Sequence, residues 1–415
     1  MKKSVFPLKK VQILFLSLVA GSAWADSAQL QGVIRKAFEK DPKVLAAQAN
    51  QKIANSKVKQ AQAGHQPRLS VFAQQNMHQN HRYTENKSSK FTPGAQVSLN
   101  LYSFGAVEKR VKQTEKAEQT YRYKIDETQE TLGYTITELY LMALRATETL
   151  NVLKQSLVRI DSTLNDIDVI ADYDEGRRSE FVQAQARKYA IEQQINSTER
   201  ELKTMVDKLK RYSGRAIDLK KISNPFNGLN AEKLVAKYSS DKNAHPTIQV
   251  SHSEIEDANA ELEARKAERL PKLDLVGQAT RDDQVVYLNM SWDVYNPESA
   301  YQVQERAERL LLAESNLEQT NLDIEERKSL ALLNLSEYQA HIKTLNNQIK
   351  TQEEVIEFYK LQFLIAKRTL LELLNAENEL LSAQLSKVNS EYQLRHSVLD
   401  YLSSQGTLRK WVNGK

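Results

Sequence analysis

Residues 286–298 read VYLNMSWDVYNPE, and they join a strand pattern to a very long helical pattern. Val286, Leu288 and Met290 alternate with more polar neighbours, and this two-residue period predicts a strand with one apolar face. From Glu298 to Gln405 there is neither glycine nor proline, and the run is rich in Ala, Leu, Glu, Lys and Gln. Such a composition favours an uninterrupted helix. The sequence therefore predicts a strand that leads into a very long helix in the C-terminal part of the chain.

The same organisation occurs earlier in the chain, which indicates an internal duplication. Asp41-Pro42 corresponds to His245-Pro246, and QPRLSV at 66–71 corresponds to LPKLDL at 270–275. The segment SLNLY at 98–102 corresponds to SWDVY at 291–295, where the alternating pattern continues to Val294. Each half is thus predicted to contain a helix, two strands, a very long helix, a turn and a helix.

The predicted strands have the alternation of a transmembrane barrel, with one apolar and one polar face. Soluble hairpins packed on helices are the alternative. Four strands cannot close a barrel, because about eight are needed. An open edge in lipid would leave backbone groups unpaired. If the strands span a membrane, the barrel must be shared between chains.

The helices are expected to pack as coiled coils. Residues 106–170 form a run of roughly 100 Å at helical rise, which needs partners along its whole length. Apolar residues in alternating three- and four-residue steps predict the seams. The first seam is Ile136, Leu139, Ala143, Ala146, Leu150, Leu153, Leu157, Ile160, Leu164, Ile167 and Ala171. The second is Leu371, Leu374, Leu381, Leu385, Val388, Tyr392, Leu399 and Leu402, interrupted by Asn378 and Arg395.

The N-terminus has the features of an export signal. Four lysines precede the apolar stretch 11–20, which is too short to span a bilayer as a helix, and Ala23-Trp24-Ala25 provides a cleavage site. Cleavage after Ala25 is predicted. The chain has no cysteine, so neither a lipidated N-terminal cysteine nor a disulfide framework is expected. Without the signal lysines the chain is nearly neutral, which gives no basis for nucleic-acid binding.

The turn after the second long helix carries the most specific motif. Residues 363–376 read FLIAKRTLLELLNA, which resembles the aromatic-x-x-Gly-x-Arg-Thr-x-x-Asp-x-Leu-Asp-Ala segment of the TolC family. The first-half counterpart is 173–179, YDEGRRS, continuing to Gln185-Ala186-Arg187. The resemblance covers essentially the whole chain after the signal. It implies a mainly α fold with a membrane β-barrel contribution: a long coiled-coil α-helical barrel and four strands per chain, which complete a 12-stranded barrel in a homotrimer.

The resemblance also implies an arrangement of segments. These are a signal peptide (1–25), an N-terminal periplasmic helix (26–64), a first outer-membrane β-hairpin (65–102), a first long helical hairpin (103–214), an equatorial linker (215–240), a second-repeat helix (241–270), a second β-hairpin (271–295), a second long helical hairpin (296–403) and a C-terminal tail (404–415). The linker and the tail are expected to be irregular and to pack as a belt around the helices.

In the family, acidic residues at this turn narrow the tunnel entrance, and links between arginine and acidic residues hold it shut. By position, Glu372 corresponds to a retained acid and Arg368 to the linking base. Asn375 replaces the second acid, and Phe363 stands where tyrosine is common. Val182 occupies the position of the partner acid, with Glu180 and Asp174 nearby. The alternative is that Arg368 and Glu372 form only a surface pair four residues apart.

Other functional sites have little support. The pair His78-x-x-His81 lies in a polar loop without an accompanying carboxylate site pattern, so no metal or cofactor is predicted. No nucleophile elbow, phosphate loop or zinc motif is present, and no enzyme activity is expected.

Three functions remain. The first is an outer-membrane exit duct of a Gram-negative bacterium with a long periplasmic extension, which would work with a periplasmic adaptor and an inner-membrane ABC transporter in type I secretion of a polypeptide. The second is the same duct in small-molecule efflux with a proton-driven pump. The third is a periplasmic coiled-coil tether without a channel.

Overall fold

The computed structural model describes residues 22–75, 91–171, 178–214, 218–281, 283–365 and 367–414. These residues divide into two compact units. Unit 1 holds the described residues of 1–41, 129–241 and 324–415, and unit 2 holds those of 42–128 and 242–323. The two longest helices, α3 (Ala106–Ala171) and α7 (Pro297–Leu364), run through both units.

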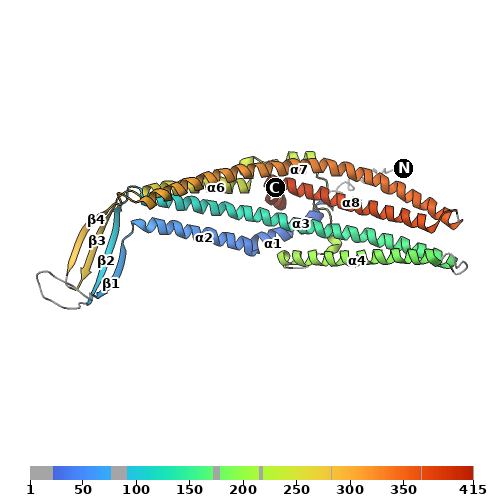
Figure 1. Ribbon diagram of the computed structural model, residues 1–415, viewed down its shortest axis with the longest axis horizontal. Coiled ribbons are helices and arrows are strands. Elements are labelled where there is room, and N and C mark those ends of the chain that lie inside the picture. The colour runs from blue at the N-terminus through green and yellow to red at the C-terminus, as the bar shows by residue number, and fades with distance from the viewer. Residues whose placement is uncertain are drawn as a thin grey trace, which may run out of the picture. The chain divides into compact units, whose positions relative to one another are not determined.

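Unit 2 contains one antiparallel sheet of four strands in chain order (Figure 1). The strands are β1 (Arg68–Gln75), β2 (Phe91–Tyr102), β3 (Lys272–Thr280) and β4 (Gln284–Ser291). A bulge in β2 between Asn100 and Tyr102 shifts its register against β3. Strands β1 and β4 are the two edges, so the sheet of one chain is open.

The helices of unit 2 are α2 (Pro42–Gln62), α6 (Pro246–Ala267) and the first parts of α3 and α7, with short 3-10 turns at Ala63–His65 and Lys242–Ala244. Each half places a proline at the start of its helix, where no backbone donor is lost. The His245 ring caps α6 by accepting from the Thr247 amide at 3.2 Å. Helices α3 and α6 are joined by a buried hydrogen bond between Thr120 and Ser253 (2.9 Å) and by the Lys109–Glu263 ion pair (2.6 Å).

Unit 1 is built from α1 (Ser22–Lys40), α4 (Arg178–Ser213), α8 (Leu370–Ser404) and the remaining parts of α3 and α7. The seam predicted on α3 is buried at most of its positions, for example at Ile136, Leu153 and Ile167. On α8, Leu374 and Leu399 are buried, but Leu371 is half exposed. Within the single chain, Leu370 and Leu373 take the buried positions at this end of α8.

The long helices agree closely with the pattern. The expected helix 106–170 is Ala106–Ala171, since no proline or strand signal interrupts it. The expected extension of the last strand to Val294 is wrong. Strand β4 ends at Ser291, because its partner Lys272 is the first residue of β3 and no residue of β3 is left to pair with Trp292.

The expectation of irregular backbone is also wrong in the linker and the tail. The linker contains a 3-10 turn at Leu219–Lys221 and α5 (Ala231–Tyr238), which Asn230 caps and whose Leu234 is buried. The tail contains α9 (Leu408–Asn413). Its first amides donate to the buried Glu130 of α3 at 2.7 and 3.2 Å, so a short helix is stabilised by tertiary contacts rather than by its own length.

None of the helices described is long and apolar enough to cross a bilayer. Helix α1 begins at Ser22, ahead of the predicted mature start at Asp26. Most of the signal segment, the His78/His81 loop and the first-half turn 172–177 lie outside the described residues.

Candidate functional site

The turn between α7 and α8 holds the four predicted aperture residues. Phe363 is buried in the last turn of α7 and anchors the end of that helix. The Lys367 amide then donates to the carbonyl of Gln362 at 2.9 Å, which closes the end of the helix. The chain reverses over a few residues, and α8 starts at Leu370.

A capping box fixes the start of α8. The hydroxyl of Thr369 accepts from the Glu372 amide at 3.3 Å, and the Glu372 carboxylate accepts from the Thr369 amide at 3.0 Å. The reciprocal bonds satisfy two amides that a helix N-terminus would leave unpaired. This role of Glu372 was not predicted from the sequence, although Thr-x-x-Glu before an apolar run is the signature of the box.

Arg368 lies beside the box and binds within its own turn. Its guanidinium pairs with Glu372, donates to Gln362 Oε1 at 3.1 Å, and stacks 4.5 Å from the centroid of the Tyr359 ring. The Thr369 amide and the Arg368 guanidinium lower the pKa of the Glu372 carboxyl below its usual value. The Glu372 carboxylate in turn raises the pKa of Arg368. Both groups are therefore charged at neutral pH, and the pair four residues apart is present.

Asn375 lies one turn further along α8 and connects it to α4. Its side-chain oxygen accepts from Arg187 Nη2 at 3.4 Å. The structure thus brings together Asn375 and a residue of the first-half counterpart, a contact across 188 positions that no local pattern encodes. Val182 is half exposed on the same α4 helix.

Three further contacts tie α3 to the second hairpin close to this turn, and sequence reasoning did not find them. Arg159 of α3 pairs with Glu377 of α8 at 2.7 Å, and Glu377 is almost fully buried. Lys360 of α7 pairs with Asp166 at 3.2 Å and donates to the Ser162 hydroxyl at 3.2 Å. The only sequence feature that could have indicated the Arg159–Glu377 pair is the charged residue Glu377 among the leucines of the predicted seam.

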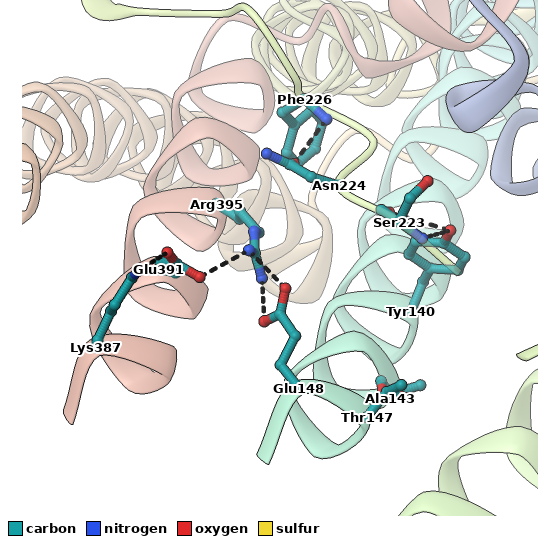
Figure 2. Close-up of polar contacts among 10 residues, drawn as sticks. All are labelled: Tyr140, Ala143, Thr147, Glu148, Ser223, Asn224, Phe226, Lys387, Glu391 and Arg395. Atoms are coloured by element: carbon teal, nitrogen blue, oxygen red, sulfur yellow. Dashed lines mark hydrogen bonds and ion pairs between the residues drawn. The ribbon is translucent and has the colours of Figure 1, made fainter. Parts of the chain in front are cut away.

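A second link between α3 and α8 lies deeper in unit 1 (Figure 2). Arg395 binds Glu148 through two hydrogen bonds of 2.7 and 2.8 Å, and it also reaches Glu391 at 3.3 Å. Figure 2 also shows Tyr140 of α3 holding the linker, through bonds of 3.2 Å to both the amide and the carbonyl of Ser223. Polar contacts therefore fix α3 to both α8 and the linker.

The sheet of unit 2 has two chemically different faces. In antiparallel pairs, directly opposed residues share a face, so the register assigns every side chain. Apart from Gln75 and Gln284 at strand ends, one face is apolar. It holds Leu69, Val71, Ala73, Phe91, Pro93, Ala95, Val97, Leu99, Tyr102, Leu273, Leu275, Gly277, Ala279, Val286, Leu288 and Met290.

The opposite face is mainly polar. It holds Arg68, Ser70, Phe72, Gln74, Thr92, Gly94, Gln96, Ser98, Asn100, Lys272, Asp274, Val276, Gln278, Thr280, Val285, Tyr287, Asn289 and Ser291. Asn100 donates to Asp274 on this face at 2.8 Å. The large apolar residues of the other face, such as Val71, Val286 and Leu288, are more than half exposed in the single chain. Such a surface is unsuited to water and suited to lipid.

The sequence model of the outer membrane efflux protein family matches residues 33–215 and 238–401, which is most of the chain. The chain belongs to this family. Members of the outer membrane efflux protein family are channel proteins of the Gram-negative outer membrane and not enzymes. Family membership confirms the prediction of an outer-membrane channel and the prediction that the protein is not an enzyme. No curated protein matches the sequence.

Solved structures share the fold of this outer membrane efflux protein. The outer-membrane channel OprN superposes with a TM-score of 0.78 at 16% identity, over 92% of this chain and 91% of that chain. The CmeC channel of Campylobacter jejuni superposes with a TM-score of 0.76 at 16% identity, over 92% of this chain and 87% of that chain. VceC of Vibrio cholerae superposes with a TM-score of 0.77 at 15% identity, over 93% of this chain and 98% of that chain. The resemblance to the TolC family and the fold of long helices with barrel strands are confirmed.

Proposed function

We propose that three copies of this chain form a continuous exit duct across the outer membrane. The supporting observation is the four-stranded sheet, which has an apolar face and two open edges. Backbone groups at an edge cannot be left unpaired in lipid, so β4 of one copy must pair with β1 of the next. Two copies would give a barrel of about eight strands, and side chains fill the interior of a barrel of that size. Three copies supply twelve strands and leave a bore.

The oligomeric mass in detergent tests this assembly. The expected result is a trimer that requires detergent for extraction and sediments with the outer membrane. A water-soluble monomer would overturn the proposal. The intact mass would also show whether the mature chain begins at Asp26, as cleavage after Ala25 requires.

The duct is proposed to work in type I secretion of a polypeptide, with an ABC transporter in the inner membrane and a periplasmic adaptor. The lack of any cysteine for lipid attachment and the short linker support this use over the alternative, small-molecule efflux with a proton-driven pump. Deleting the gene separates the two. Loss of one extracellular polypeptide with unchanged drug tolerance is expected, and the opposite pattern would favour efflux. The tether without a channel is set aside because the chain belongs to a channel family.

The turn between α7 and α8 is proposed as the periplasmic aperture. Glu372 would form a ring of three carboxylates, Arg368 and Asn375 would hold the helices at the turn, and Phe363 would anchor it. The described contacts support this role: Glu372 stays ionised, Arg368 is bound beside it, and Asn375 is joined to Arg187 of α4.

The substitution Glu372→Gln tests the aperture without removing the cap, because glutamine also serves in a capping box. We expect single channels of this variant to lose cation selectivity and block by divalent ions. Glu232→Gln, an equal charge change at an exposed position of the linker helix α5, is the matched control and should leave both unchanged. Unaltered selectivity and block in Glu372→Gln would refute the aperture role and leave only the surface pair.

A further inference from the structure

A cavity of about 600 Å³ lies in unit 2, where the sheet meets the helices. The ends of β2, β3 and β4 line it together with the neighbouring turns of α2, α3, α6 and α7. The strand residues that line it, Asn100, Lys272 and Ser291, all belong to the polar face of the sheet. The cavity therefore lies on the side of the sheet that faces away from the apolar surface.

Basic side chains outnumber acidic ones in this cavity. Four cations line it, from α3, α6 and the segment that joins α6 to β3: Arg110, Arg265, Arg269 and Lys272. Among the described residues of the lining, Glu268 and Asp293 are the two acids. The lining therefore carries two positive charges in excess.

The excess lies at the junction of α6 and β3. Glu268 is shared between two cations, because it binds Arg110 at 3.1 Å and also pairs with Arg265. Arg269 and Lys272 form no ion pair with either acid or with any other residue that the structure describes. Both residues are exposed, so the donors of their guanidinium and ammonium groups are available to an anion.

The arginines of the adjoining cavity are compensated differently. That cavity continues along the helices, and its Arg306 and Arg309 are paired with Glu261 and Glu305, at 3.1 and 2.8 Å. These arginines are thus neutralised locally, whereas Arg269 at the sheet end has no acidic partner within the described chain. The unpaired guanidinium is therefore a feature of the junction with the sheet.

Two long helices begin at the same cavity. Ala106, the first residue of α3, and Asn296, which precedes α7, both line it. The N-terminal end of a helix carries a partial positive charge, so α3 and α7 add to the potential of the basic side chains. Because the cations come from different elements, they are spread over the wall of the cavity. A ligand with two separated anionic groups suits this arrangement better than a single small anion.

We infer that this cavity binds a pair of carboxylates from an acidic stretch of a polypeptide, with Arg269 and Lys272 as the main binding groups. Arginine binds carboxylates through two parallel hydrogen bonds, and lysine binds them as a point charge. The inference deepens the proposed function and rests on it, because a polypeptide reaches the polar side of the sheet only if the trimer is a duct. Three such cavities would line its bore and favour acidic cargo.

Calorimetric titration of the purified, detergent-solubilised oligomer tests the site directly. The probe is tetraglutamate with blocked ends, and tetraglutamine is the uncharged reference. The titration is made at low ionic strength, because salt screens exposed charges. We expect binding of tetraglutamate alone. Arg269→Gln/Lys272→Gln should bind it at least about tenfold more weakly, since charge-assisted hydrogen bonds are lost. Absence of tetraglutamate binding by the native protein would overturn the inference.

Two further variants separate the site from general surface charge and from misfolding. Lys52→Gln/Arg122→Gln removes the same charges from exposed positions of α2 and α3 that do not line the cavity, and it should bind like the native protein. Arg269→Lys/Lys272→Arg keeps the charges and should retain most of the affinity. Equal weakening in Lys52→Gln/Arg122→Gln and in the cavity variant would show a general charge effect and overturn the inference.

Conductance separates failure of the site from failure of the duct. In planar bilayers, tetraglutamate should shorten the openings of the native channel and leave those of Arg269→Gln/Lys272→Gln unchanged. Openings without calorimetric binding would show that the site is wrong and leave the duct standing. Calorimetric binding without any conductance would support the binding site and contradict the duct.

Discussion

Arg395 occupies a seam position of α8, where Glu148 of α3 binds its guanidinium with two hydrogen bonds. Its side chain is only 10% exposed. Removing Glu148 would leave the buried guanidinium with only the weaker 3.3 Å contact to Glu391, and a buried charge that loses its main partner is costly. Glu148→Gln is therefore expected to lower the free energy of unfolding of unit 1 by about 3 kcal/mol, measured by circular dichroism during denaturation. The double variant Glu148→Leu/Arg395→Met should recover most of the loss, and an additive double loss would contradict this reading.

His396 gives unit 1 a pH dependence. Its Nδ1 lies 3.0 Å from Asp400, its Nε2 lies 3.8 Å from Glu138, and the rings of Tyr134 and Tyr392 flank it. The hydrogen bond with Asp400 raises the pKa of His396 above 6.5. A raised pKa stabilises the folded state fully below the unfolded pKa, and this stabilisation is lost as the pH rises through the folded pKa.

The expected result follows from that sign. The thermal midpoint of unit 1 should fall between about pH 6 and pH 8 in the native chain, and it should fall less in His396→Gln, where no proton is exchanged. Asp400→Asn should flatten the curve in the same way. An equal slope in all three proteins would show that His396 contributes nothing.

At the scale of elements, the capping box decides where α8 begins. Thr369→Ala removes the hydroxyl that accepts from the Glu372 amide and should cost about 1 kcal/mol of local stability. Hydrogen exchange of the Glu372 amide measures this directly. The exchange should be faster in Thr369→Ala and nearly native in Thr369→Ser. Unchanged exchange in the alanine variant would mean that packing of Phe363 and Leu370 alone fixes the turn.

The packing of α9 against α3 depends on Gly133 of α3. A Cβ at Gly133 would lie 2.4 Å from Cδ2 of the buried Leu408, whereas a Cβ at Gly32 in α1 meets nothing within 4 Å. Both glycines are helical, so alanine should stabilise at Gly32 by up to about 1 kcal/mol. At Gly133 it should destabilise by about 1–3 kcal/mol through overpacking and displace α9. The thermal midpoint and the emission of Trp411, which α9 carries, report the two effects. A gain in stability at both positions would contradict the close packing of Leu408 against Gly133.

The elements differ in how far sequence could predict them. The extent of α3 and the strand faces follow from periodicity, because burial repeats with the geometry of the element. The helix α9 is too short to show a period, and it depends on Glu130, which is far away in the chain. Likewise, the partners of Asn375 and Arg395 come from contacts across 188 and 247 positions. The box at Thr369 and Glu372 and the pair of Arg368 and Glu372 four residues apart are the parts of the site with a local signal.

At the scale of the whole molecule, the sheet requires more than one chain, since four strands leave two open edges. In the proposed duct, the apolar face of the sheet would contact lipid, the polar face would line a water-filled bore, and the turn at Arg368 and Glu372 would form the narrow end. Passage through such a duct would need no catalytic chemistry. It would depend on the bore, the charge of its wall and an end that opens, with the energy supplied by the proposed partner transporter.

Conductance of the purified protein in a planar bilayer tests this account most directly. We expect long-lived openings of low conductance, because the proposed trimer would have a continuous bore that narrows at the proposed aperture. The absence of any conductance, from a protein of confirmed mass and membrane insertion, would contradict the proposal that the assembled chain is a duct.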